Sequence, residues 1–167
     1  MFRRNVSQKK RAVLEFRDDA DAYTRQKAQP ENVDHVLELQ LIQWATEDIL
    51  AQNEALSKNM ADAVNDVFNL NVTSKTINQS KRGPFTAALN RVKKGQRPNV
   101  DDLARGGRAR WLVDNGCWDR IKQETVLSYD KLEETLSSKV MTRAHSKKLE
   151  QATDAIRDLM DNIHLIN

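Results

Sequence analysis

Apolar residues recur at every third or fourth position over much of the first 70 residues. This spacing places them along one side of a helix, and it predicts helices over 6–28, 36–57 and 59–68. Pro30 and Asn32 interrupt the pattern between the first two, because proline cannot continue a helix. The N-terminal part of the chain is therefore expected to be helical.

The pattern changes after residue 69. Apolar and polar residues alternate over 70–73, and the alternation predicts a short strand. Ser74 or Thr76 is the candidate N-cap of a following helix, and Gly83-Pro84 is expected to end that helix. Residues 85–92 predict another short helix.

The last third of the chain is helical in pattern. Residues 101–113 favour a helix although they contain Gly106-Gly107. From residue 119 onward two segments keep helical spacing, which predicts a helical hairpin. The expected fold is mainly α with a small β-hairpin, and a chain of 167 residues suits one domain with at most a small appendage.

Charge is unevenly distributed along the chain. Ten basic and two acidic residues lie between residues 75 and 110, a local net charge of +8 in a chain whose total is +3. Such asymmetry favours a polyanionic partner, and the alternative is an ordinary basic surface. The basic residues are Lys75, Lys81, Arg82, Arg91, Lys93, Lys94, Arg97, Arg105, Arg108 and Arg110.

Other classes of protein are disfavoured by composition. No segment is apolar enough to span a membrane, and the N-terminal residues lack the apolar core of a secretory signal. We therefore expect a site of action in the cytoplasm or the nucleus and no contact with a membrane. The single cysteine, Cys117, excludes an intrachain disulfide.

Residues suited to catalysis form an ordered set. Asp34-His35 comes first, in the stretch NVDHVLELQ, and Asn69 precedes the predicted strand. Asn78 follows nine residues after Asn69, and Lys81 three residues after Asn78. The dipeptide alone carries little information, whereas the ordered spacing is a stronger signal.

This set resembles the HNH endonucleases, in which two strands and a helix surround one divalent metal ion. It is similar to the variant of the family that has Asn as the last motif residue, and to the same unit in colicin-type toxins and CRISPR-effector nucleases. The resemblance implies a ββα-metal core over 30–98, with a helical insertion at about 36–68. A helical N-terminal segment (1–29) and a helical C-terminal region (99–167) would pack around that core.

The resemblance also implies a role for each motif residue. Asp34 and Asn78 would bind the metal, because carboxylate and amide oxygens suit Mg²⁺ or Mn²⁺; Zn²⁺ and Ni²⁺ are alternatives. His35 would be the general base, Asn69 would brace the loop that carries it and orient its ring, and Lys81 would offset the charge of the scissile phosphate. The nine other basic residues of the span would contact the phosphates of the substrate.

Structural interpretations of the same residues stay open at this stage. Asp34 could cap a helix that starts near Val36, with His35 as a surface residue of its first turn. Asn69 could be a turn residue. Glu38, three residues after His35, could help to hold the imidazole or approach the metal, or it could be a solvated helix residue.

The sequence therefore predicts a metal-dependent endonuclease that hydrolyses DNA with low sequence specificity, in a toxin, effector or defence role. RNA is the alternative substrate. The C-terminal helices would serve as a contact for an inhibitor, such as an immunity protein, or for a second copy. Two further interpretations are a catalytically inactive nucleic-acid-binding module and a helical protein-interaction domain.

Overall fold

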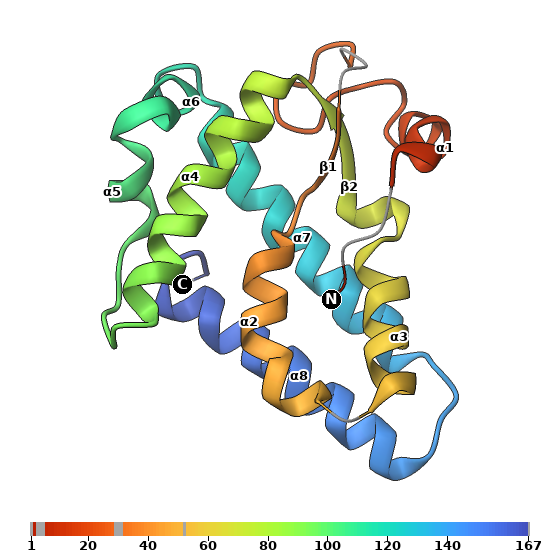
Figure 1. The fold of residues 1–167 in the computed structure, drawn as a ribbon. Coiled ribbons are helices and arrows are strands. Elements are labelled where there is room, and N and C mark those ends of the chain that lie inside the picture. The colour runs from red at the N-terminus through yellow and green to blue at the C-terminus, as the bar shows by residue number, and fades with distance from the viewer. Residues whose placement is uncertain (1, 3–5, 29–31, 52, 167) are drawn as a thin grey trace.

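The computed structural model describes residues 2, 6–28, 32–51 and 53–166. Within these residues, helices surround one two-stranded antiparallel sheet (Figure 1), which confirms the mainly α fold with a small β-hairpin. In chain order the elements are η1 (Ser7–Lys9), α1 (Lys10–Phe16), β1 (Asn32–His35), α2 (Leu39–Leu50), α3 (Glu54–Val64), η2 (Val67–Asn69), β2 (Leu70–Thr73), α4 (Lys75–Val92), α5 (Val100–Ala104), η3 (Gly107–Ala109), α6 (Arg110–Asp114), α7 (Cys117–Ser137) and α8 (Arg143–Asn162).

The hairpin brings together two segments that lie far apart in the sequence. Asp34 of β1 is opposite Asn71 of β2, and His35 is opposite Leu70. The strand predicted over 70–73 is confirmed. The residue pattern alone predicts no strand at Asn32–His35, where the structure has β1. The break expected at Pro30 lies outside the described part of the chain.

The two faces of this hairpin differ in chemistry, because successive strand residues point to opposite sides. One face carries Asn32 and Asp34 with their partners Thr73 and Asn71. The other face joins a small apolar cluster around Val13 of α1. The polar face is thereby turned toward α4 and the segment that follows α1, where the candidate site lies.

The N-terminal segment departs from the predicted helix over 6–28, which is wrong beyond Phe16. The chain leaves α1 with positive backbone φ angles of 51° at Asp18 and 57° at Asp19. Aspartate tolerates this left-handed conformation better than most residues do. The segment is then fixed by tertiary contacts, among them a hydrogen bond from the Ala22 amide to the Asn71 side chain.

The insertion between the two strands is helical, but its helices begin and end at other residues than predicted. α2 starts at Leu39 and ends at Leu50, so the expected helix over 36–57 is too long at both ends. Asn53 then starts α3, because its side chain accepts a hydrogen bond from the Leu56 amide at 3.0 Å. The helix expected over 59–68 is the last part of α3, which ends at Val64.

Helix α4 runs through Gly83-Pro84, where the sequence predicted an end. Proline in a helix interior removes one backbone hydrogen bond. Burial on both sides of it outweighs this loss, since Ile77, Phe85 and Leu89 all lie in the core. The consequence is one continuous helix that starts beside the hairpin and runs away from it, with the residues that precede and follow Pro84 on the same element (Figure 1).

The start of α4 supports a specific prediction. Ser74, one of the two candidate caps, accepts a hydrogen bond from the Ile77 amide at 3.2 Å. Ser74→Ala should lower the free energy of unfolding by about 1 kcal/mol, because one helix N–H loses its partner. Urea unfolding measures this, with Thr76→Ala as the matched control. An equal effect of both substitutions would contradict this cap.

The C-terminal hairpin is confirmed as α7 and α8, and α8 lies along α2 (Figure 1). The predicted helix over 101–113 is instead divided into α5, η3 and α6, and Gly107 has a φ angle of 56° at the division. No described helix is both long and apolar enough to cross a lipid bilayer.

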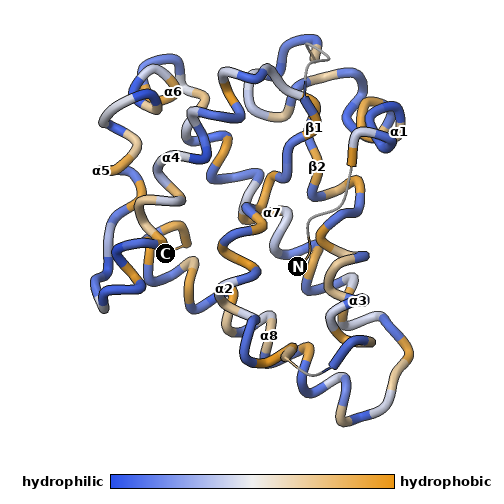
Figure 2. The backbone as a smooth tube through the Cα atoms, viewed as in Figure 1, coloured by the Kyte–Doolittle hydropathy of each residue, from blue (hydrophilic) through white to orange (hydrophobic). Residues whose placement is uncertain are grey.

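One apolar cluster contains residues from all three predicted regions, 1–29, 30–98 and 99–167. It includes Tyr23 from the N-terminal segment, Phe85 from α4, and Trp118, Leu132 and Ile156 from the C-terminal helices. Apolar and polar residues alternate along α2, α7 and α8 (Figure 2). The C-terminal helices therefore support the element that carries the candidate site.

Candidate active site

The ammonium group of Lys81 lies buried between α4 and the hairpin. Its Nζ is 2.7 Å from Asp34 Oδ2 and 3.0 Å from Glu38 Oε1, and the side chain is 0% exposed. It also donates hydrogen bonds to the carbonyl oxygens of His35 (2.5 Å) and Val36 (3.3 Å) and to the Tyr23 hydroxyl (3.2 Å). We call Tyr23, Asp34, Glu38 and Lys81 the lysine cluster.

Opposing electrostatic effects meet in the lysine cluster. Burial alone would lower the pKa of Lys81, but the carboxylates of Asp34 and Glu38 outweigh it and hold this pKa well above its usual value. Burial raises the pKa of Tyr23 well above its usual value. Lys81 is therefore charged at neutral pH, and Tyr23 is neutral and donates to Asp34 Oδ2 at 3.1 Å.

Glu38 is the least satisfied member of the cluster. Burial raises the pKa of its carboxyl group, while Lys81 lowers it. Its Oε1 is within ion-pair distance of Lys81 Nζ, but the geometry makes no hydrogen bond, and no described group donates to that oxygen. A buried carboxylate oxygen without a donor is rare, because it costs free energy.

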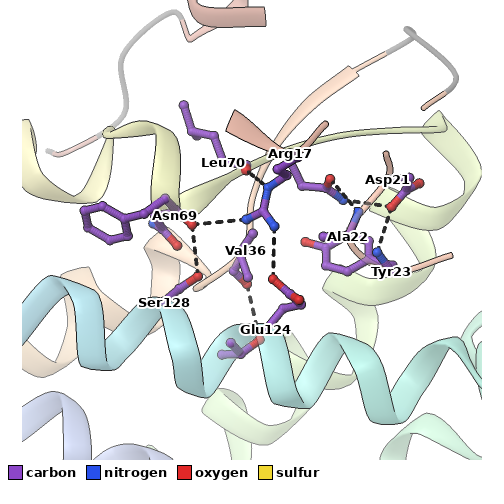
Figure 3. Close-up of polar contacts among 12 residues, drawn as sticks. Arg17, Asp21, Ala22, Tyr23, Val36, Asn69, Leu70, Glu124 and Ser128 are labelled. Carbon is purple, nitrogen blue, oxygen red and sulfur yellow. Dashed lines mark hydrogen bonds and ion pairs between the residues drawn. The ribbon is translucent and has the colours of Figure 1, made fainter. Parts of the chain in front are cut away.

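A second buried network fixes Tyr23. Asp21 accepts a hydrogen bond from the Tyr23 amide at 2.8 Å (Figure 3). It also accepts from the Asn71 side chain at 2.9 Å and from the Thr73 hydroxyl at 2.6 Å. The carboxylate thus ties the N-terminal segment to the polar face of β2. This network sets the position from which the Tyr23 hydroxyl reaches Asp34.

Arg17 ties the same region to α7 (Figure 3). Its guanidinium donates to the carbonyl oxygens of Phe68 and Leu70 and pairs with Glu124 at 3.0 Å. Both side chains of the ion pair are 10% exposed. The junction of η2 and β2 is thereby anchored to the longest helix of the C-terminal region.

His35 lies on the opposite face of β1 from Asp34, as an extended backbone requires. Its Nε2 is 2.9 Å from Asn65 Oδ1. The amide nitrogen of Asn65 donates to the carbonyl oxygens of Phe2 and Ala61, so Oδ1 faces the imidazole as an acceptor. Nε2 is therefore the donor in this hydrogen bond.

Asn69 braces the chain just after His35. Its Oδ1 accepts from the Leu37 amide at 2.7 Å, and its Nδ2 donates to the Val64 carbonyl at 2.8 Å. The side chain therefore holds the start of the insertion against its end. The contact to the imidazole ring comes from Asn65, a residue that the sequence did not single out.

The hydrogen bonds of the Asn69 side chain predict that shortening it destabilises the fold. Asn69→Ala should lower the free energy of unfolding by about 1–3 kcal/mol, because it leaves buried backbone groups of Leu37 and Val64 without partners. Chemical denaturation tests this against Asn78→Ala, for which we expect a change below about 0.5 kcal/mol. Equal losses would show that the brace contributes no stability.

The donor chemistry around Asp34 fits a hard cation. Asp34 and Glu38 supply carboxylate oxygens, and half-buried Asn78 lies one helical turn before Lys81 on the same side of α4. Within the described part of the chain, the Asn78 side chain makes no hydrogen bond or ion pair. In the same part of the chain, no three His, Cys, Asp or Glu side chains gather closely enough to hold a metal ion.

Nine of the ten basic residues between residues 75 and 110 are exposed, and Lys81 is the buried exception. Arg97, Arg105 and Arg110 make ion pairs at the surface, where such pairs contribute little. The charge of Arg82 acts on Glu38 and lowers its pKa, after the larger effects of burial, Lys81 and Asp34. The exposed positive surface therefore reaches the edge of the lysine cluster.

The structural alternatives for the motif are partly resolved by this geometry. Asp34 does not cap a helix and His35 does not lie in a helical turn, because both are in β1. Glu38 precedes α2 and contacts Lys81. Asp21, Tyr23 and Arg17 had not been recognised, because an irregular segment without periodicity gives no signal of what it contacts.

We compared the chain with known protein families, curated proteins and solved structures. The chain matches no family model, no curated protein and no solved structure.

Proposed function

We propose that the protein is a metal-dependent endonuclease whose centre lies where β1 meets α4. One observation supports this most: Lys81 Nζ lies 2.7 Å from Asp34 Oδ2, although 46 intervening residues separate the two in the chain. The two halves of the motif are thus adjacent in space. The order strand, strand, helix is also the one expected of a ββα-metal core.

Asp34 and Asn78 are the proposed metal ligands, with Glu38 as a further carboxylate beside them. A divalent ion bound there would stabilise the negative charge that develops on a phosphodiester during hydrolysis. His35 is the proposed general base for the attacking water, and Asn65 holds its ring through Nε2. Asn69 fixes the backbone that carries the ring.

The role of Lys81 differs from the one that the family resemblance implies. Its ammonium is enclosed by five oxygen atoms, so in the metal-free protein we assign it the positioning of Asp34 and of the backbone at His35 and Val36. The exposed residues Arg82, Arg91, Lys93 and Lys94 are better placed to meet a phosphate backbone. Such contacts carry no sequence information, in line with low specificity for DNA or RNA.

A second candidate is a nucleic-acid-binding module without catalysis. It is favoured by the same ion pair, because Lys81 already neutralises Asp34, whose side chain is only 8% exposed. An interaction domain has less support: on the described C-terminal hairpin the large exposed apolar residues are Leu127 and Val140, which form no continuous stripe. A contact of these helices with an inhibitor or a second copy stays a prediction.

Plasmid cleavage separates the two main candidates. We expect wild-type protein to nick supercoiled DNA with Mg²⁺ or Mn²⁺ and not with EDTA. Asp34→Asn should lower this rate by at least about tenfold, and Asp130→Asn, at an exposed position of α7, should leave it unchanged. Salt-sensitive DNA binding without any nicking would support the binding module.

A further inference from the structure

The surroundings of Lys81 Nζ form an oxygen cage. Asp34 Oδ2, Glu38 Oε1, the Tyr23 hydroxyl and the carbonyl oxygens of His35 and Val36 lie 2.5–3.3 Å from the nitrogen. An ammonium group can donate only three hydrogen bonds, so five oxygen neighbours exceed what it can satisfy. Five converging oxygens are, in contrast, typical of a metal site.

The charges of the cage also favour a cation with more than one positive charge. Two carboxylates face one ammonium group in a buried setting, and Glu38 Oε1 has no hydrogen-bond donor among the described residues. Ca²⁺ binds oxygen ligands at about 2.3–2.6 Å, a small contraction of this cage, and Mg²⁺ requires about 2.0–2.1 Å. A divalent ion would bring one more positive charge than Lys81 provides.

We propose that Lys81 is a built-in competitor of a divalent cation, which takes the place of the ammonium group between Asp34 and Glu38. The identity of this cation as the nuclease metal rests on the proposed function, whereas the competition itself does not. Ammonium and metal exclude each other because both need Asp34 Oδ2. The flexible four-carbon stem of lysine lets the ammonium leave without a change in α4.

The competition gives the ammonium group of Lys81 two alternative positions. With Lys81 in the cage, its ammonium group faces both carboxylates and keeps a divalent ion out. With a divalent ion in the cage, the ammonium is released toward the basic surface next to Arg82, where it can meet a phosphate. Lys81 thereby sets the cation concentration at which the site fills.

Isothermal titration with Mn²⁺ and with Ca²⁺ tests this without DNA. Lys81→Met keeps an unbranched side chain that is one atom shorter and removes its charge, and we expect it to bind the ion at least about tenfold more tightly than wild type. Lys148→Met, at an exposed position of α8, is the control and should bind as wild type does. Adding Glu38→Gln to Lys81→Met should remove most of the gain, because a cage carboxylate is lost.

Two outcomes overturn the proposal. One is Lys81→Met that binds no more tightly than Lys148→Met. The other applies if Lys81→Met does not fold in metal-free buffer. We then expect Mn²⁺ to restore its helical circular dichroism signal. A protein that stays unfolded with Mn²⁺ would overturn the proposal. If Lys81→Met binds the ion more tightly but the wild-type protein does not cleave DNA, the proposed nuclease function is wrong and the proposed cation competition is supported.

Discussion

His35→Ala should lower the rate of metal-dependent plasmid nicking by about 10²- to 10⁴-fold, the usual contribution of a general base. The imidazole is the proposed general base, and Asn65 holds it through Nε2. Initial nicking rates measure the effect. His145→Ala, in the first turn of α8, is the matched control and should retain the wild-type rate.

The two histidine variants also separate catalysis from folding. His35→Ala leaves Asn65 Oδ1 without its donor, so a loss of about 1 kcal/mol in stability is expected. Thermal unfolding must therefore show that the variant is folded at the assay temperature. Nicking by His35→Ala at the wild-type rate would mean that the activity arises at another site or from a contaminating nuclease.

Lys81→Met should lower the free energy of unfolding by about 3–5 kcal/mol in metal-free buffer, because removal of one partner leaves buried charges uncompensated. Asp34 and Glu38 would lose their counter-charge, and the carbonyl groups of His35 and Val36 would lose a donor. Urea unfolding in EDTA measures the loss. Lys148→Met should change stability by less than about 0.5 kcal/mol.

A partial recovery is expected in the double variant Lys81→Met/Glu38→Gln. Removing one of the two buried carboxylates reduces the uncompensated charge, so the double variant should be more stable than Lys81→Met alone. If Lys81→Met were as stable as Lys148→Met, the ammonium would not lie in the cluster in solution, and the positioning role of Lys81 would be wrong.

The sequence predicted those parts of the fold that depend on local patterns. The strand over 70–73 and the hairpin of α7 and α8 follow from residue spacing that each segment carries by itself. The irregular segment after Phe16 could not be predicted, because buried contacts such as Asp21 with Thr73 fix it. Helix α4 crosses Pro84 because packing of distant residues outweighs a local signal.

The candidate site was predictable only in part for the same reason. The order of Asp34, His35, Asn69, Asn78 and Lys81 could be read from the sequence, and their roles in a reaction stay predictions. That Lys81 would be enclosed depends on α4 lying against the hairpin, which no local pattern encodes.

Binding of Mn²⁺ tests the central claim most directly. Electron paramagnetic resonance counts bound Mn²⁺ in wild type, Asp34→Asn and Asp130→Asn at equal protein concentration. We predict about one ion per chain in wild type and in Asp130→Asn, and at least about tenfold weaker binding in Asp34→Asn. Equal binding by Asp34→Asn and wild type would contradict a metal centre where β1 meets α4.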